Sequence, residues 1–209
     1  MTRSPAKTTA ALTVFSSATR AIQAQKGSRE AYRRMEEGRG WRTRIDADLQ
    51  AFAESLTSVF LTTASADGQP YIQHRGGPAG FLRVLDEHTL AFVDFAGNRQ
   101  YISQGNLSEN PKAYLFLIDY AQQRRIKVWG TARVVENDTA LFDGLMPDGY
   151  AARPEQVMLF DVVAWDENCS QHIPQRFEAA DVRAVLAERD ERILALEAQL
   201  ARLTTAAAT

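Results

Sequence analysis

The chain has 209 residues, of which 45% are hydrophobic, and a formal net charge of -2 at pH 7. This length allows one domain with a buried core and helical additions, and the charge gives no global indication of nucleic-acid or membrane affinity. No apolar run approaches the roughly 18 residues that span a bilayer. One cysteine, Cys169, excludes an internal disulfide framework. The start lacks the apolar centre of a secretion signal, so we expect a cytoplasmic protein.

Residues 1–57 are predicted to form a basic, helical N-terminal arm. Apolar residues recur at helical spacing over residues 12–35 with a break near Gly27, and Asp46 is placed to cap a further helix. Residues 1–44 hold ten Lys and Arg against three acidic residues. A basic arm can bind polyanions, but we expect this one to pack on an acidic face of its own protein or of a partner subunit.

Residues 58–178 are predicted to form the main domain, because short apolar runs alternate there with turn signals. Gly68 suits a tight hairpin turn, and Gly130 suits a bulge or barrel corner inside the longest run. Six antiparallel-type strands with turn-length links favour a barrel that closes to remove its edges. These strands are Val59–Ala64, Tyr71–Arg75, Phe81–Leu85, Thr89–Phe95, Ala113–Ile118 and Arg125–Val135, and Val157–Trp165 is predicted as the last strand.

Helices are predicted at three places beyond the first strands. Asn98–Leu107 is a short helix with Asn98 as an ordinary cap, and Asp138–Met146 is a second one. In residues 179–209 a long helix carries apolar residues at spacings of three, four and seven, with Arg189 in one position of the seam. About three heptads are marginal for a free coiled coil, so we expect a helix that stabilises a dimer or covers the barrel.

The predicted strands and loops carry an ordered series of motifs. They are Ser65-Ala66-Asp67-Gly68-Gln69-Pro70, Gln73-His74-Arg75-Gly76-Gly77-Pro78-Ala79-Gly80-Phe81, Phe95-Ala96-Gly97-Asn98-Arg99-Gln100-Tyr101-Ile102-Ser103, Gly105-Asn106-Leu107, Ile126-Lys127-Val128-Trp129-Gly130-Thr131-Ala132 and Asn168-Cys169-Ser170-Gln171-His172-Ile173. This series resembles the flavin-binding split-barrel proteins related to pyridoxamine 5'-phosphate oxidase. The resemblance implies a mainly β fold with flanking helices, a six-stranded antiparallel split barrel and a long C-terminal helix. It also implies a homodimer that binds FMN non-covalently in clefts at the subunit interface.

The resemblance further implies an FMN-dependent oxidoreductase that moves electrons between a small organic substrate or NAD(P)H and an acceptor such as oxygen. The resemblance assigns cofactor-binding roles to four groups of residues. His74, Arg75 and Gly76 would contact the flavin ring, and Asn98, Arg99, Gln100 and Ser103 would contact the phosphate. Lys127 and Trp129 lie on a strand expected at the flavin or the dimer interface, and Asn168, Gln171 and His172 belong to a loop expected to close over the cofactor.

Two features leave alternatives open. A C-terminal arginine-rich run that would hold the substrate phosphate in pyridoxamine phosphate oxidases is not found after Phe177, so oxidation of vitamin B6 is in doubt. A flavin-binding or haem-binding protein without turnover and a reductase dependent on the deazaflavin F420 are the alternatives. Arg75 or Lys127 is expected as the cation beside the reduced flavin ring. With three histidines and one cysteine, a structural zinc site is not expected.

Overall fold

The computed structural model describes residues 10, 13–167 and 169–207. The chain divides into two compact units. The first comprises the chain up to Asp119 together with Arg124–Gln171, and it contains the whole sheet. The second comprises Tyr120–Gln123 and the chain from His172 onward.

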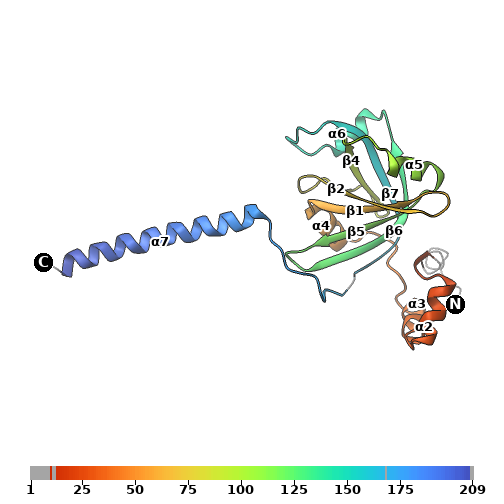
Figure 1. Cartoon of the computed structure of the whole chain (residues 1–209), viewed down its shortest axis with the longest axis horizontal. Coiled ribbons are helices and arrows are strands. Elements are labelled where there is room, and N and C mark those ends of the chain that lie inside the picture. Colours follow the sequence, from red (N-terminus) through yellow and green to blue (C-terminus); the bar gives the residue numbers. More distant parts are fainter. Residues whose placement is uncertain (1–9, 11–12, 168, 208–209) are drawn as a thin grey trace. The chain divides into compact units, whose positions relative to one another are not determined.

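The first unit is built on one antiparallel, strongly curved sheet of seven strands in the order β2-β1-β5-β6-β7-β4-β3 (Figure 1). The expectation of six strands closed on themselves is therefore corrected in two respects. The last strand lies between β6 and β4 and is a seventh member of the sheet, and the hydrogen-bonded order ends at β2 on one side and β3 on the other. The strands are β1 (Ser58–Ala64), β2 (Pro70–Gly76), β3 (Arg83–Val84), β4 (Thr89–Phe95), β5 (Lys112–Asp119), β6 (Arg124–Val135) and β7 (Pro154–Glu167).

Glycines determine two local features of this sheet, as predicted. Gly68 has a φ of 91° in the turn between β1 and β2, a conformation that side chains with a Cβ rarely adopt. The pairing of β6 with β7 shifts register between Trp129 and Gly130. A Cβ on Gly130 would lie 2.2 Å from the carbonyl oxygen of Asp161, so only glycine allows this close approach of the two strands.

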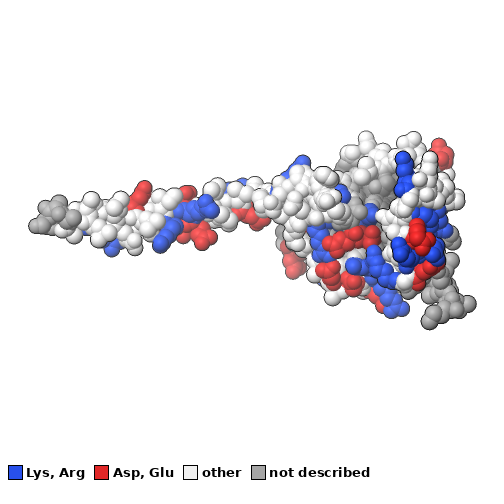
Figure 2. Space-filling model, turned by 90° about the horizontal axis from the view of Figure 1, so that it is seen from below, with Lys and Arg blue, Asp and Glu red and all other residues white. Residues whose placement is uncertain are grey.

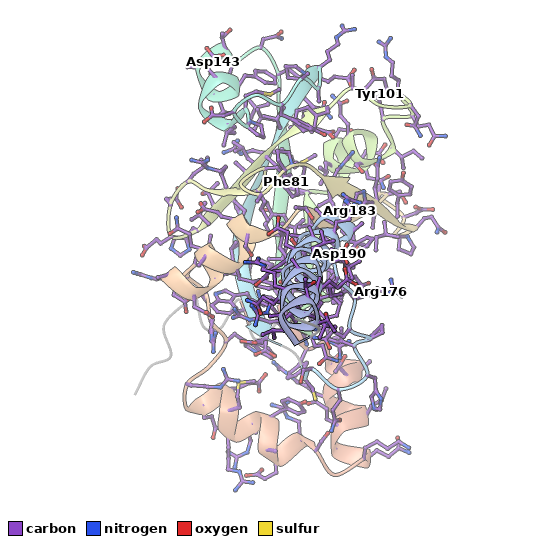
Figure 3. All side chains as sticks on the ribbon, turned by 90° about the vertical axis from the view of Figure 1, so that its left-hand side faces the viewer. Phe81, Tyr101, Asp143, Arg176, Arg183 and Asp190 are labelled. Carbon is purple, nitrogen blue, oxygen red and sulfur yellow. The ribbon has the colours of Figure 1, made fainter. Side chains whose placement is uncertain are left out.

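The barrel interior holds the main hydrophobic core. Strand β1 alternates half-buried and buried residues, because successive side chains of a strand point to opposite faces. Helix α4 (Ala47–Ser55) covers this core with Leu49, Phe52 and Ala53, and Asp46 Oδ1 caps it by accepting a hydrogen bond from Leu49 N at 2.9 Å. Phe81, between β2 and β3, is 2% exposed and lies among the strands (Figure 3).

Two further helices flank the sheet and position its loops. Helix α5 (Ile102–Glu109) follows β4, and helix α6 (Thr139–Leu145) follows β6 and is capped by Asp138. The expected start of α5 at Asn98 is wrong. The helix begins four residues later, because Arg99 and Tyr101 adopt φ values of 58° and 54°, which interrupt a helical backbone.

The N-terminal arm contributes helices α2 (Ser17–Gln25) and α3 (Arg29–Glu37), separated at Gly27. The buried carboxylate of Glu36 accepts hydrogen bonds from Arg20 and Arg29. Further along the arm, Arg44 forms an ion pair of 2.8 Å with Glu87, in the turn between β3 and β4. Arginines of the arm therefore pair with carboxylates of their own chain.

The second unit consists of a short connection and helix α7 (Ala179–Ala207). Gln123 donates to the carbonyl of Ile173 at 2.6 Å, and Gln175 donates to that of Ala121 at 2.9 Å. None of the helices in the described part of the chain is long and apolar enough to cross a membrane.

Candidate functional site

A polar cavity of about 260 Å³ lies where β2, β4 and β7 meet the loop that precedes α5. Its walls therefore come from segments that are far apart in sequence and that the sheet brings together. The lining residues are Tyr71, Gln73, Arg75, Asp94, Phe95, Gly97, Asn98, Arg99, Gln100, Tyr101, Ile102, Ser103, Gln104, Glu155 and Gln156. Seven residues of β2 and of the segment around the start of α5 were predicted to contact the ring or the phosphate. Five of them line this cavity, and His74 and Gly76 do not.

Arg75 anchors one wall of the cavity. Its guanidinium lies 2.9 Å from Oδ1 of Asp94, and Gln156 donates to Oδ2 of the same carboxylate at 2.9 Å. The side chains of Arg75 and Asp94 are 14% and 9% exposed, so this ion pair is largely shielded from water. The buried Nε of Arg75 has no hydrogen-bond partner in the part of the chain that the structure describes. A buried donor without a partner costs free energy of folding, so this wall of the cavity is less than optimal for stability.

The loop before α5 forms the outer wall. Arg99 donates to the hydroxyl of Tyr101 at 2.9 Å, and that hydroxyl donates to Oε1 of Glu155 at 2.7 Å. The hydrogen bond to Tyr101 raises the pKa of Arg99 above its usual value, so the guanidinium stays charged. The Arg99 side chain is 73% exposed and can turn toward a bound anion. Tyr101 lies beside the start of α5 (Figure 3).

The opening turn of α5 offers additional donors. Tyr101 is its N-cap residue and makes no side-chain hydrogen bond to the first turn. Ile102, Ser103 and Gln104 of this turn line the cavity. The first amide groups of a helix lack partners within the helix and favour negative charge, so this end of the cavity suits an anion.

A row of polar side chains on β2 completes the cavity and was not predicted. Tyr71 and Gln73 line it together with Arg75, and Ser103 donates to Oε1 of Gln73 at 3.2 Å. The signal was present in the sequence: residues two and four positions before Arg75 share its face of the strand. Asp94, Glu155 and Gln156 were also missed, because their placement depends on how β4 pairs with β7.

His74 and Gly76 lie on the other side of Arg75. They line a smaller cavity of about 120 Å³, whose walls also include Arg75, Asp94 and Phe95. His74 Nε2 is 2.7 Å from the hydroxyl of Ser58. The two cavities are thus neighbours that share Arg75, and the predicted residues of β2 are divided between them.

Lys127 and Trp129 lie elsewhere on the barrel and do not belong to the described lining of either cavity. The ring of Trp129 contacts Trp41 and Tyr114 edge to face, at centroid distances of 5.9 and 5.3 Å. Lys127 Nζ lies 5.3 Å above the Trp129 ring. This face of β5 and β6 is covered by the N-terminal arm through Trp41 and Phe15.

The predicted closing loop is described only in part. Asn168 lies outside the described residues. Gln171 belongs to the first unit and is exposed, and its backbone N–H donates to Sγ of Cys169 at 3.4 Å. His172 is exposed and begins the second unit with a φ of 65°.

The sequence profile of the pyridoxamine 5'-phosphate oxidase family matches residues 45–169. This match covers more than half of the chain, so the protein belongs to the pyridoxamine 5'-phosphate oxidase family. The matched segment contains all seven strands and both cavities, whereas α2, α3 and α7 lie outside it. A comparison with curated proteins gives no match.

Several solved structures are similar to the chain. HupZ of Group A Streptococcus is 16% identical, with 64% of this chain and 99% of that chain covered and a TM-score of 0.49. An FMN-binding protein of Syntrophomonas wolfei is 13% identical, with 70% and 97% covered and a TM-score of 0.45. A protein described as an F420 reductase is 20% identical, with 58% and 98% covered and a TM-score of 0.42.

Proposed function

We propose that this protein is an FMN-dependent oxidoreductase that transfers electrons between a small organic substrate or NAD(P)H and an acceptor such as oxygen. The observation that supports it most directly is the cavity in which Arg75, the Arg99 loop and the uncapped start of α5 converge. Family membership supports the cofactor class, because the site lies within the matched segment.

The residues of the cavity fit the phosphate end of FMN. The opening turn of α5 supplies backbone donors with a favourable dipole, and Arg99 supplies a planar guanidinium that can contact two phosphate oxygens. Ser103 supplies a hydroxyl at the same end. In this proposal Arg99, Ser103 and the α5 amides hold the phosphate.

Arg75 fits the role of the cation beside the flavin ring better than Lys127 does. Arg75 lines both cavities and has a buried unpaired donor, whereas Lys127 lies against Trp129 and 4.0 Å from Asp166. When bound, FMN supplies the hydride and single-electron chemistry. The protein's contribution is to hold a positive charge close to the ring, where Asp94 and Gln156 fix the direction of the guanidinium.

The size of the cavity supports a homodimeric site. At about 260 Å³ it is smaller than the roughly 300 to 1,000 Å³ of pockets that bury most of a drug-sized ligand. A second subunit packed over its mouth would supply the missing wall. We therefore propose that each cofactor site lies at the interface of a homodimer.

Reconstitution tests the cofactor. The protein, freed of bound small molecules, is titrated in separate arms with FMN, F420 and haem, and binding is followed by fluorescence or absorption. We expect saturable binding of one FMN per chain that Arg99→Ala weakens and Arg133→Ala, at an exposed position of β6, leaves unchanged. Preferential binding of F420 or haem would contradict the FMN assignment.

Turnover tests the activity. The FMN-loaded protein is mixed with NADH, NADPH or pyridoxamine 5'-phosphate in air, and oxidation is compared with that by free FMN at the same concentration. A rate above free FMN, lost in Arg75→Gln, supports an enzyme. Tight FMN binding with no oxidation of any donor would instead support a carrier or sensor.

A further inference from the structure

Helix α7 presents an apolar stripe along one side. From residue 179 to residue 203 it places apolar side chains three and four positions apart, with one gap of seven at Arg189, which is the a and d pattern of a coiled coil. The exposed fractions of its last three members, Leu196, Leu200 and Leu203, are 46%, 65% and 68%. The stripe consists of Ala179, Leu186, Ile193 and Leu200 at a, and of Val182, Leu196 and Leu203 at d, with Arg189 as the one charged d residue.

We propose that this stripe binds α7 of a second copy of the chain as a parallel two-stranded coiled coil. The proposal rests neither on the cofactor nor on the cavity. A left-handed coiled coil requires a repeat of 3.5 residues, and the stripe keeps this repeat from residue 179 to residue 203 with Arg189 as its single charged position. A helix that packs only on a globular surface has no need of so regular a repeat.

The charges beside the stripe favour a parallel second copy. In a parallel pair, a g residue faces the e residue five positions later on the other helix. Here Glu178 at g faces Arg183 at e, and Arg192 at g faces Glu197 at e. Each pair has opposite charges and occurs twice by symmetry, and like charges do not face each other at any g and e position from residue 178 to residue 204.

Arg189 fits the same arrangement. In a parallel pair a d residue packs beside the e residue that follows the facing d position, which here is Asp190 of the second copy. The aspartate can compensate the charge that Arg189 brings into the seam. Acidic and basic side chains lie next to one another along α7 in Figure 2, and Figure 3, which looks along the helix, labels Arg183 and Asp190.

An antiparallel pair would be less favourable. The antiparallel register that pairs every a residue with a d residue places residue 179 opposite residue 203 and residue 186 opposite residue 196. In this register e residues face e residues and g residues face g residues, so Asp190 and Arg192 each lie opposite their own copy. Arg183 still faces Glu197, but two repulsive contacts appear that the parallel pair does not have. The charge pattern therefore favours the parallel orientation.

Parallel pairing is also compatible with a closed dimer. The two-fold symmetry axis of a parallel coiled coil runs along the coil, so both copies use the same surface. No second apolar surface is left to recruit further copies. About three heptads are marginal alone. A dimer contact elsewhere in the chain would raise the effective concentration of the helices.

Disulfide trapping in the full-length chain tests the proposal. Cys169→Ser removes the native thiol, and Leu203→Cys or Val182→Cys then places one thiol at a d position near either end of α7. Facing d residues in a parallel pair lie close enough for a disulfide. In the antiparallel pair, the two copies of residue 203 would be about 36 Å apart along the axis. We expect rapid, nearly complete cross-linking of both single-cysteine proteins under mild oxidation.

Two matched substitutions test the stripe itself. Leu196→Asp, at a d position, should slow cross-linking at residue 203 at least tenfold and reduce the helical circular dichroism. Leu194→Asp, the same substitution at an exposed leucine outside the stripe, should change neither. Cross-linking only between an Ala179→Cys chain and a Leu203→Cys chain, whose cysteines face each other in the antiparallel pair, would overturn the parallel orientation. If neither the Val182→Cys nor the Leu203→Cys protein forms cross-links, the proposal that a second copy binds the stripe would be overturned.

Discussion

The two faces of the barrel that carry predicted site residues differ in what covers them. On the face of β2 and β4, Arg75 keeps an unpaired donor at the wall of a polar cavity. On the face of β5 and β6, Trp129 contacts Trp41 and Tyr114, and the N-terminal arm lies over it. Both faces belong to the same motif series, yet the first gathers charged and polar side chains around a cavity and the second gathers aromatic rings. Among the described residues each face also buries one unpaired donor, Arg75 Nε on the first and Trp41 Nε1 on the second.

This difference shows how the same sheet can separate binding from stability. A cavity lined by charged groups loses free energy of folding wherever a donor stays unpaired, whereas edge-to-face rings gain it by burying large apolar surfaces. We therefore expect substitutions on the aromatic face to change stability without changing cofactor affinity. Substitutions in the cavity should mainly change affinity.

The largest effect is expected from Trp41→Ala on the aromatic face. Trp41 is 6% exposed and contacts Phe15 and Trp129, at centroid distances of 5.2 and 5.9 Å. Removing a buried tryptophan side chain costs about 3 to 5 kcal/mol of unfolding free energy. Urea unfolding measures the loss, with FMN affinity unchanged at low urea. Tyr32→Ala, at the exposed end of the same ring series, should cost less than half as much. Equal losses would show that Trp41 does not anchor the arm.

Arg75→Gln should lower both the unfolding free energy and the affinity for FMN, because Arg75 is one partner of a shielded ion pair in the cavity wall. Asp94 is then left with Gln156 alone, and breaking such a pair costs on the order of 3 kcal/mol or somewhat less when partly solvated. FMN affinity should fall roughly 10- to 100-fold with the lost charge-assisted contact.

The double variant Arg75→Gln with Asp94→Asn separates the two effects. It removes both charges while keeping the side-chain shapes similar, so the unfolding free energy should recover. FMN affinity should stay low, because the cation is still missing. Recovery of affinity together with stability would show that Arg75 acts only by holding the fold.

Arg99→Ala should weaken FMN binding at least tenfold and leave stability almost unchanged. Its guanidinium is largely exposed, and its ion pair with Glu155 spans 4.0 Å, so it adds little to folding. One charge-assisted phosphate contact contributes roughly 1.5 to 3 kcal/mol. Isothermal titration with FMN measures the change against Arg133→Ala. Dissociation constants that agree within twofold would remove Arg99 from the site.

The fold was largely predictable from local patterns. The alternation along β1 and the glycines at positions 68 and 130 are local signals, and the structure confirms all three. The prediction of a six-stranded barrel was wrong in the number of strands that share the sheet. Whether the last strand joins the sheet depends on pairing between distant segments, and β7 pairs with both β6 and β4. The start of α5 was wrong because the positive φ values of Arg99 and Tyr101 leave no sequence signal of their own.

The candidate site was predictable only along single strands and loops. The structure places Arg75, Arg99 and Ser103 around one cavity, as expected of residues in two neighbouring motifs. Asp94 and Glu155 could not be assigned to it, since their approach depends on the register between β4 and β7. Lys127 and Trp129 could not be separated from it either, because the arm that covers their face comes from the other end of the sequence.

The smallest effect should come from the ionisation of Tyr114 on the aromatic face. Burial raises the pKa of its hydroxyl from 10.0 to about 12, against a weaker opposing effect of Arg125. The folded state thus holds this proton more tightly than the unfolded state. Its stabilising contribution is complete below pH 10 and is lost as pH rises toward 12. Unfolding free energies of the wild type and Tyr114→Phe, measured from pH 9 to about 12, should therefore diverge, with the wild type losing more. Parallel curves would mean that the arm leaves Tyr114 open to water, in contrast to the covered face described above.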